Sequence, residues 1–396
     1  MTEAVSYPQD RSCPYQPPTG YQPLLEAGPI TRAKLYDGRE AWIVTGHAEA
    51  RQLLTDERLS SVRENPAFPV PSPRFAAIPL EQRRTPLLGA DGPEHHAQRR
   101  MLLPRFTNQR VADLRPRIQQ LVDELLDDMI EKGPTADLAT AFALPLSSSV
   151  ICALLGVPYT DHAFFEEQSS LLLRATTGEE AAGAAVQLMT YMGELIARKE
   201  SDPGDDLLDT LVAHLRAGEL ERQDAVSLAI FMLIAGHEST ANMITLSTLT
   251  LLEHPAQLAA LRADDSLFPN AVNELLRLLS IVEGLARVAT KEIGIGGVVI
   301  RPDDAVFFAT SLINRDPSLY PAPDELDLAR SARQHVSFGF GTHLCLGHNL
   351  ARVEMEIALR ALFTRLPNLH LATPIDQISI SPGDTIQGPL SLPIAW

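Results

Sequence analysis

The chain has 396 residues, of which 45% are hydrophobic and 21% are charged, and its formal net charge is −17. This composition is typical of a globular protein with a large core, and the acidic balance argues against nucleic acid as a partner. No apolar run reaches the roughly 18 residues of a membrane span, and the N-terminus lacks the basic and apolar regions of a signal peptide. Three cysteines do not make a disulfide framework, so we expect a cytoplasmic protein.

Short strands and turns are predicted up to about residue 60. Residues 35–46, LYDGREAWIVTG, place Asp37-Gly38 between two β-rich runs, which is a hairpin signal. Residues 65–93 are rich in proline and show no periodicity. We expect a loop there, and loops of this length inside a compact domain are usually functional or mobile.

Helical periodicity dominates the middle of the chain. Apolar residues recur every three or four positions in residues 111–130 and 185–199, and a further helix is expected over 270–280. The longest pattern runs from about Asp224, its predicted N-cap, to His254 before a proline. At the rise of an α-helix, this pattern spans roughly 46 Å, enough to cross the whole molecule.

The last third of the chain mixes strands, loops and one long helix. Short β-rich runs occupy residues 284–309, and a proline-rich meander follows over 314–330. A glycine-rich loop over 337–347 leads into a helix over 348–366, and the tail, 378–396, predicts a hairpin. Together the elements predict one domain, residues 1–396, of the mainly α (α+β) class, with a helix-rich part and a small β part.

Cys345 ends the glycine-rich loop directly before an amphipathic helix. The amides at that helix start, around Leu346 and Gly347, favour a thiolate. A buried structural cysteine is the commonest alternative, and it is our interpretation of Cys152, which lies on an apolar helical face. Another alternative is a zinc site, whose possible ligands are His335, His343, Cys345 and His348.

The zinc-protease signature was tested at His237-Glu238 in the longest predicted helix. That signature needs a second histidine three residues after the glutamate. The chain has Ala241 at that position, so the motif fails.

Three motifs occur in order along the chain: Ala235-Gly236-x-Glu238-Ser239, Glu274-x-x-Arg277, and F-x-x-G-x-x-x-C-x-G ending in the cysteine loop. Together, and over nearly the full length, they resemble the cytochromes P450, which are cysteine-thiolate haem monooxygenases. The chain is most similar to the soluble bacterial, actinobacterial branch that hydroxylates secosteroids, macrolides and other polyketides, and xenobiotics.

The resemblance implies haem b, bound between the long central helix and the helix after the cysteine loop. Cys345 matches the axial ligand of the iron, a thiolate that favours O–O cleavage. Further haem contacts are expected at Ala235, Phe338 and Gly347. The family's matches for the haem propionates are His95, Arg99, Arg287 and His343, whereas His96 and Arg100 are expected on a solvated face. Glu274, Arg277 and Arg330 match a buried ion-pair triad that braces the cysteine loop.

The resemblance also assigns the polar stretch IAGHEST, residues 234–240, to the oxygen side of the haem. Gly236 is expected to leave space for dioxygen, and Glu238 with Ser239 to relay protons to it, with Thr240 standing next. Burial would raise the pKa of Glu238, which suits a proton donor. The alternative is that both hydroxyls only bond to carbonyls of their own helix.

The positions that match the family's substrate contacts are nearly all apolar, so we expect a bulky lipophilic substrate; they are Leu88, Leu233, Val282, Leu285, Ile386 and Gln387. Arg74 either binds a polar end of the substrate or is a solvated loop charge.

No electron-transfer module is found in the chain, so the resemblance implies a ferredoxin, an NAD(P)H-dependent ferredoxin reductase and a monomeric enzyme. A local basic dock for the ferredoxin is expected, formed by Arg100, Arg105, Arg110 and Arg352. Two alternatives to a hydroxylase using O2 are a haem-binding sensor or carrier, which does not need Glu238 and Ser239, and a peroxide-driven haem enzyme, which in this family lacks such a pair.

Overall fold

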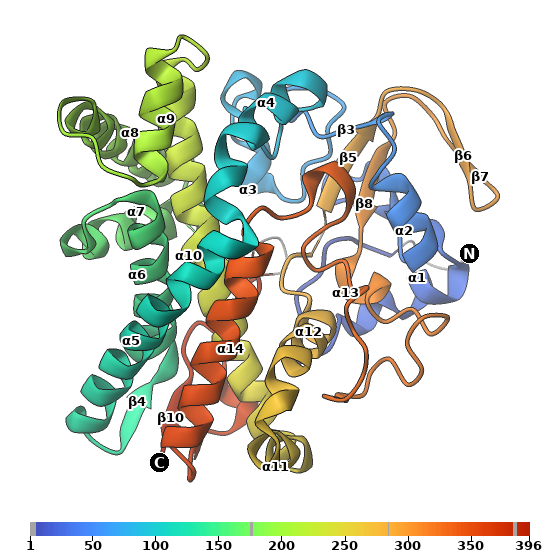
Figure 1. Cartoon of the computed structure of the whole chain (residues 1–396). Helices are drawn as coiled ribbons and strands as arrows, with labels where there is room; N and C mark the ends of the chain where they lie inside the picture. Colours follow the sequence, from blue (N-terminus) through green and yellow to red (C-terminus); the bar gives the residue numbers. More distant parts are fainter. Residues whose placement is uncertain (1–4, 175–176, 284, 383–385) are drawn as a thin grey trace.

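The computed structural model describes residues 5–174, 177–283, 285–382 and 386–396. Helices make up most of it (Figure 1). The α-helices are α1 (Gln22–Ala27), α2 (His47–Leu53), α3 (Pro73–Ala76), α4 (Gly92–Leu102), α5 (Asn108–Lys132), α6 (Leu144–Leu155), α7 (His162–Arg174), α8 (Gly178–Ser201), α9 (Leu207–Arg216), α10 (Arg222–Leu252), α11 (Pro255–Ala263), α12 (Phe268–Leu279), α13 (Thr310–Ile313) and α14 (His348–Arg365). Short turns of tighter or wider helix join them at η1 (Thr19–Tyr21), η2 (Leu80–Gln82), η3 (Leu103–Phe106), η4 (Ala139–Ala143), η5 (Tyr159–Asp161), η6 (Asp265–Leu267), η7 (Gly341–His343) and η8 (Ile375–Gln377).

The strands are β1 (Ile30–Lys34), β2 (Glu40–Val44), β3 (Leu59–Ser60), β4 (Thr135–Asp137), β5 (Leu285–Ala289), β6 (Ile293–Ile295), β7 (Val298–Ile300), β8 (Ala305–Phe308), β9 (His370–Leu371) and β10 (Pro393–Ala395). Most strands lie at the right of the helical part in Figure 1, whereas β4 and β10 lie at the lower left, beside α5 and α14. The largest sheet has the order β1-β2-β8-β5-β3, another has β4-β10-β9, and β6 pairs with β7. The expected mainly α architecture with a small β part is confirmed.

The predicted hairpin over residues 35–46 is the β1–β2 pair. Its antiparallel register joins Ile30 to Val44 and Lys34 to Glu40, and Gly38 takes a positive φ of 84° in the turn, where a residue without a Cβ is favoured. The tail also pairs with itself, since Ile380 bridges Pro389. The tip of that tail lies outside the described residues.

Helix α10 runs through the helical part, behind α5 and α14 in the view of Figure 1. Of its 31 residues, 20 are buried, because apolar residues lie all round the helix and neighbours cover every face. Its buried threonines satisfy their hydroxyls within the helix; Thr245 and Thr248, for example, bond to the carbonyls four residues earlier. The helix therefore forms the centre of the helical part, and other helices pack against it.

Two predicted boundaries were wrong in detail. Helix α10 begins at Arg222 with Glu221 at the N-cap position, so Asp224 is a first-turn residue and not the N-cap. Its carboxylate forms an ion pair with Arg84, which local sequence patterns do not reveal. The proline-rich loop also contains a short helix, α3.

The predicted ion-pair triad is present and buried. Arg277 Nε lies 2.7 Å from Glu274 Oε2, with both side chains fully buried, and Arg330 Nε lies 3.1 Å from Glu274 Oε1. Arg277 also donates to the Asn314 carbonyl oxygen at 3.0 Å. The Asn314 side chain in turn accepts from the Val336 amide at 2.7 Å, so the triad is linked to the start of the cysteine loop.

Candidate active site

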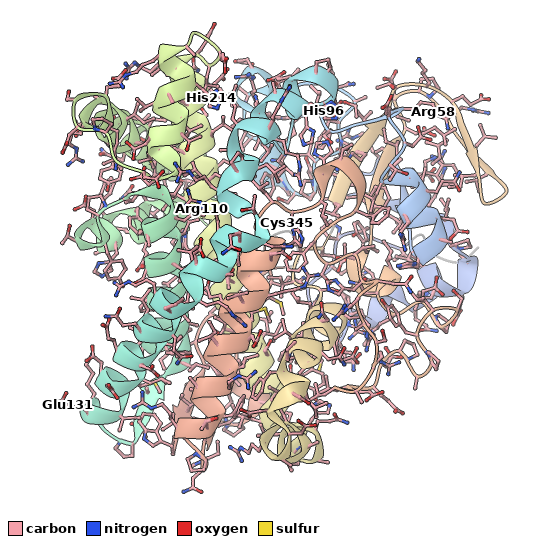
Figure 2. The ribbon with its side chains drawn as sticks, in the orientation of Figure 1. Arg58, His96, Arg110, Glu131, His214 and Cys345 are labelled. Carbon is pink, nitrogen blue, oxygen red and sulfur yellow. The ribbon has the colours of Figure 1, made fainter. Side chains whose placement is uncertain are left out.

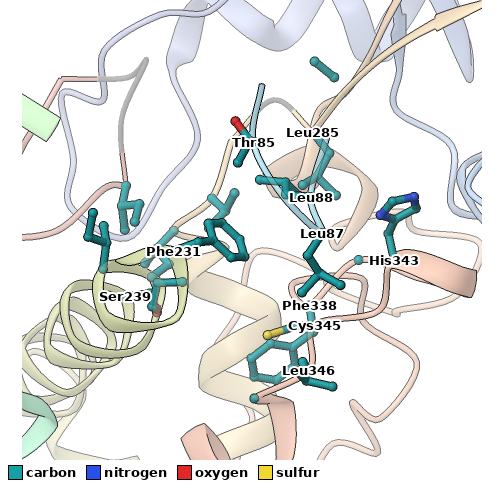
Figure 3. Close-up of a pocket in the computed structure, with 18 of the residues that line it drawn as sticks. Thr85, Leu87, Leu88, Phe231, Ser239, Leu285, Phe338, His343, Cys345 and Leu346 are labelled. Carbon is teal, nitrogen blue, oxygen red and sulfur yellow. The ribbon is translucent and has the colours of Figure 1, made fainter. Parts of the chain in front are cut away.

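A cavity of about 710 Å³ lies between α10 and the cysteine loop. Figure 3 shows the Cys345 sulfur pointing into it, with Ser239 of α10 on another wall. Segments far apart in sequence complete the walls, including the proline-rich segment, α4, α6, the strand β5 and the tail residue Ile386. The expected placement of a site between α10 and α14 is therefore reproduced.

The cysteine loop is held by its own backbone. The Cys345 amide donates to the Phe338 carbonyl oxygen at 2.8 Å. Gly341 has a positive φ of 74°, and a Cβ there would lie 2.8 Å from the Leu54 carbonyl oxygen. Glycine is thus required at position 341 for both backbone angle and space. The conformation of the loop is therefore set by contacts within the protein.

Opposing effects act on the Cys345 thiol. Burial raises its pKa, and this effect is larger than the opposing ones from the Gly347 and His348 amides and from the Arg99 and Arg352 cations. The expected influence of the helix-start amides is therefore confirmed in direction, but in the protein alone burial outweighs it. A metal cation bound to the sulfur deprotonates a thiol outright, so the loop suits a cysteine that ligates a metal.

Four basic side chains meet at the cavity wall. His95 and Arg99 come from α4, Arg287 from β5 and His343 from η7. The rings of His95 and His343 stack with centroids 4.0 Å apart. Burial lowers the pKa of His95 to about 4, that of His343 to about 3 and that of Arg287 to about 10. Repulsion from neighbouring cations of the cluster adds to the shifts of His95 and His343. For Arg287, attraction to Asp91 opposes the shift and repulsion from Arg63 adds to it.

This cluster lacks an anion of matching charge among the described residues. His343 Nε2 lies 3.3 Å from Ser61 Oγ and 4.0 Å from a carboxylate oxygen of Asp91, while His95 Nε2 is buried with no hydrogen-bond partner in the described part of the chain. Buried polar groups are normally paired. The four side chains therefore form a ready site for a ligand that carries more than one negative charge.

The polar stretch of α10 also borders the cavity, through Ala235, Gly236, Glu238, Ser239 and Thr240. Ser239 donates its hydroxyl hydrogen to the Ala235 carbonyl oxygen at 2.8 Å, and Thr240 donates to the Gly236 carbonyl oxygen at 3.5 Å. The back-bonding foreseen as the alternative therefore occurs. Glu238 is buried, with 7% of its surface exposed, and it faces the same cavity.

Gly236 borders the cavity and also lies against α6. A Cβ at this position would lie 2.5 Å from Ile151 Cδ1 and 2.6 Å from Ile151 Cγ1. The missing side chain therefore makes room for Ile151 of α6, which borders the same cavity, and the expected space for dioxygen stays a prediction. Sequence alone does not tell which neighbour a glycine on a buried helix admits.

Of the expected substrate contacts, four line the cavity: Leu88, Val282, Leu285 and Ile386. Leu233 is fully buried in the core, and the lining residues on α10 are instead Phe231, Met232, Ile234, Ala235, Gly236, Glu238, Ser239, Thr240 and Met243. Phe231, Ala235, Glu238 and Ser239 follow the spacing of one helical face, and Met232 and Ile234 on either side of Leu233 also border the cavity.

Two other positions, Gln387 and Arg74, were also expected to contact the substrate. Gln387 is 1% exposed and does not border the cavity. Its backbone N–H donates to the Ile281 carbonyl oxygen at 2.9 Å. Alternation along an extended segment explains this, because Ile386 and its neighbour point to opposite sides. Arg74 belongs to α3, but its side chain lies outside the part of the chain that the structure describes.

A scan against protein-family models matches residues 168–368 to the model described as Cytochrome P450. The chain is 60% identical to pentalenic acid synthase of Streptomyces avermitilis, covering 100% of this chain and 98% of that protein. It is 49% identical to vitamin D3 dihydroxylase of Streptomyces griseolus, with coverage of 100% and 98%. The chain belongs to the cytochrome P450 family. Its solved relatives include the mycinamicin VIII C21 methyl hydroxylase of Micromonospora griseorubida, with TM-score 0.93, 40% identity and coverage of 99% and 100%.

As a cytochrome P450, the protein binds haem b and is an oxygen-incorporating oxidoreductase that acts on lipophilic molecules. The cavity fits that cofactor. Its thiol lies on one wall, and the basic cluster with the unpaired His95 Nε2 suits the two carboxylates of haem b. No described helix of this P450 is long and apolar enough to cross a membrane.

The members of the expected basic dock come from the last turn of α4, from η3, from the first turn of α5 and from α14; Figure 2 labels Arg110 on α5. Two of its members bind Asp205, Arg105 at 2.8 Å and Arg110 at 3.8 Å. Arg352 Nε donates to Asn273 Oδ1 at 2.9 Å, and its guanidinium lies 4.7 Å from the Phe338 ring centroid. Three of the four cations are thus partly engaged within this P450.

Proposed function

We propose that this P450 hydroxylates a bulky lipophilic small molecule by inserting one oxygen atom from O2, with Cys345 as the axial ligand of the haem iron. The observation that carries this proposal is one apolar cavity bordered on one wall by Cys345 and on another by Glu238 and Ser239. Haem b supplies the iron at which O2 is activated, and a thiolate ligand favours O–O cleavage.

The basic cluster is proposed to hold the haem carboxylates. His95, Arg99, Arg287 and His343 would each gain a charged partner, which reverses the cost of burying them. Ala235, Phe338 and Gly347 border the same cavity and are proposed as apolar haem contacts.

Glu238, Ser239 and Thr240 are proposed to move protons toward the oxygen side of the cavity. In the present geometry the Ser239 hydroxyl gives its hydrogen to its own helix, so toward the cavity it is an acceptor. Donation to a bound molecule would require the hydroxyl to rotate, and Glu238 is the nearby acid that would replace the proton. The presence of this pair favours a hydroxylase over the sensor, carrier and peroxide-driven alternatives.

The substrate is proposed to resemble those of its relatives in size and lipophilicity. Vitamin D3 dihydroxylase is 49% identical, and 20-oxo-5-O-mycaminosyltylactone 23-monooxygenase of Streptomyces fradiae is 41% identical. The lining side chains of this P450 are mostly apolar, which suits such molecules. We further propose a cytoplasmic monomer that receives electrons from NAD(P)H through a ferredoxin reductase and a ferredoxin.

One spectrum tests the central assignment. Reduced holoprotein with carbon monoxide should show the red-shifted Soret band of thiolate ligation. Cys345→Ala should abolish that band, whereas Cys152→Ala should keep it, because Cys152 is 1% exposed in the core. Survival of the band in Cys345→Ala would sink the proposal, as would its absence from the wild type.

A further inference from the structure

We propose that Arg63 binds an anionic group of the substrate, so that this P450 selects lipophilic molecules that carry a carboxylate. The proposal rests on the function proposed above and names the chemical class of its substrate. Arg63 follows β3 at the start of the proline-rich segment and borders the cavity.

The Arg63 side chain is half-buried at the cavity wall, without a charged partner at contact distance among the described residues. Its Nη1 donates to the neutral Thr85 hydroxyl at 3.4 Å, and among the described residues no carboxylate oxygen lies within 4.0 Å of it. Glu64 attracts it only through space, and burial lowers its pKa. An arginine has five hydrogen-bond donors, and a buried charge is costly unless it is paired.

Other arginines of the same segment are engaged elsewhere. Arg83 donates to the carbonyl oxygens of Ile78 and Ala76 at 2.9 and 3.1 Å. Arg84 forms ion pairs with Glu94 and with Asp224. Arg83 borders the cavity as Arg63 does, but carbonyl oxygens hold its guanidinium, whereas Arg63 bonds to a neutral hydroxyl. A carboxylate matches the planar fork of a guanidinium in two parallel bonds.

The haem carboxylates are the competing partner for Arg63. Arg63 is close enough to Arg287 to lower its pKa, so it lies near the basic cluster. Four other basic side chains already surround that site, however, and Arg63 bonds to Thr85. Figure 3 shows Thr85 at the end of the cavity away from Cys345, beyond Leu88. We infer that Arg63 faces the substrate end.

An anion bound at this end would orient the rest of the substrate. Between Thr85 and Cys345 the walls are apolar, with Leu87, Leu88 and Phe231 visible in Figure 3. A molecule anchored by its carboxylate would therefore lay its apolar body toward Ser239 and Cys345. Arg63 would then fix which carbon approaches the reacting oxygen.

The test compares dehydroabietic acid with its methyl ester, two bulky lipophilic molecules that differ in one charge. Each is titrated into holoprotein at pH 7.5 and followed by the spin-state change of the Soret band and by calorimetry. The wild type should bind the acid more tightly. Arg63→Gln should weaken acid binding roughly ten- to a hundredfold, since the lost bonds are charge-assisted, and leave ester binding unchanged.

Two controls separate this role from others. Arg63→Lys keeps the charge and should keep part of the preference for the acid. Arg83→Gln is the control at a second cavity arginine, and it should keep the preference because the Arg83 guanidinium is held by the carbonyl oxygens of Ile78 and Ala76. Equal weakening of acid and ester in Arg63→Gln would overturn the proposal, and so would equal binding of both by the wild type. Loss of haem from Arg63→Gln would also overturn it, assigning Arg63 to the haem carboxylates. The carbon monoxide spectrum of the wild type reports separately on the Cys345 assignment.

Discussion

The cysteine loop and the middle of α10 border the same cavity, but their geometry arises differently. The loop is shaped by its own backbone, through the Cys345 amide bond to Phe338 and the positive φ of Gly341. The α10 stretch is a regular helix, and its neighbours decide what each residue does; Ile151 of α6 takes the space beside Gly236. A motif that encodes backbone conformation can therefore be interpreted from sequence more securely than one that relies on helix packing.

The largest expected effect comes from the buried ion pair of Glu274 and Arg277, which is linked to the start of the cysteine loop. Arg277→Ala leaves Glu274 buried without its closest partner, and breaking a buried pair costs about 3–5 kcal/mol. We expect a large drop in the urea midpoint and loss of haem, measured by Soret absorbance per protein. Arg100→Ala is the matched control because Arg100 is exposed, and its stability should change by less than about 0.5 kcal/mol. Wild-type haem content and stability in Arg277→Ala would show that the cysteine loop keeps its conformation without this ion pair.

On the α10 side, the same comparison predicts lost chemistry with the haem retained. Glu238→Ala and Ser239→Ala should divert NAD(P)H into peroxide and lower product per NAD(P)H by about tenfold or more, because a positioned proton donor contributes about a hundredfold or more. Thr240→Val should have the smaller effect, since its hydroxyl lies at a longer 3.5 Å from its carbonyl. Product, peroxide and haem content are measured together. Unchanged coupling in Glu238→Ala and Ser239→Ala would exclude the relay.

Much of the fold and site could be predicted from sequence, for identifiable physical reasons. Helical periodicity is a local property, so α5, α10 and α14 were expected within a few residues of their bounds. The cysteine loop, the triad and the four basic side chains were expected from motifs, and the structure brings each group together.

What sequence did not reveal depends on tertiary neighbours. Leu233 and Ile234 are adjacent apolar residues, yet only Ile234 borders the cavity, because the rotation of α10 is set by its packing. Gln387 was misplaced for the same kind of reason. Arg63 lies in a segment without periodicity, so no pattern marks its side chain as bordering the cavity. Its environment became visible only when the proline-rich segment was placed over the cavity.

The close contact between Gly236 of α10 and Ile151 of α6 can be tested by substitution. Gly236→Ala should destabilise the protein by about 1–3 kcal/mol through overpacking against Ile151. The double variant Gly236→Ala with Ile151→Ala should recover part of that loss, because the nearest remaining atom would be the Ile151 Cβ, 3.2 Å away. Urea unfolding of both single variants and the double variant gives the coupling energy. Additive effects would mean that the glycine does not serve the contact between α6 and α10.

Glu354 links the helix after the cysteine loop to α6, and it should make the stability of this P450 depend on pH. It lies on α14 after the cysteine loop, and its Oε1 accepts from Ser147 Oγ of α6 at 2.6 Å. Burial raises the pKa of Glu354 from 4.5 to about 8, so the folded protein keeps it protonated at neutral pH.

A carboxyl whose pKa is raised on folding stabilises the folded state fully only below its unfolded pKa, near 4.5. Stability from this group should fall as the pH rises from about 4.5 to about 8, by up to about 1.4 kcal/mol per pH unit. Glu354→Gln should remove this slope and be relatively more stable at pH 8 than at pH 6, as measured by urea unfolding at both values. The same slope in wild type and Glu354→Gln would show that Glu354 is ionised in the folded protein. In that case the contact between α14 and α6 would contain a buried carboxylate. The geometry of α14 would then depend on its neighbours, as that of α10 does, and would not follow from the cysteine loop alone.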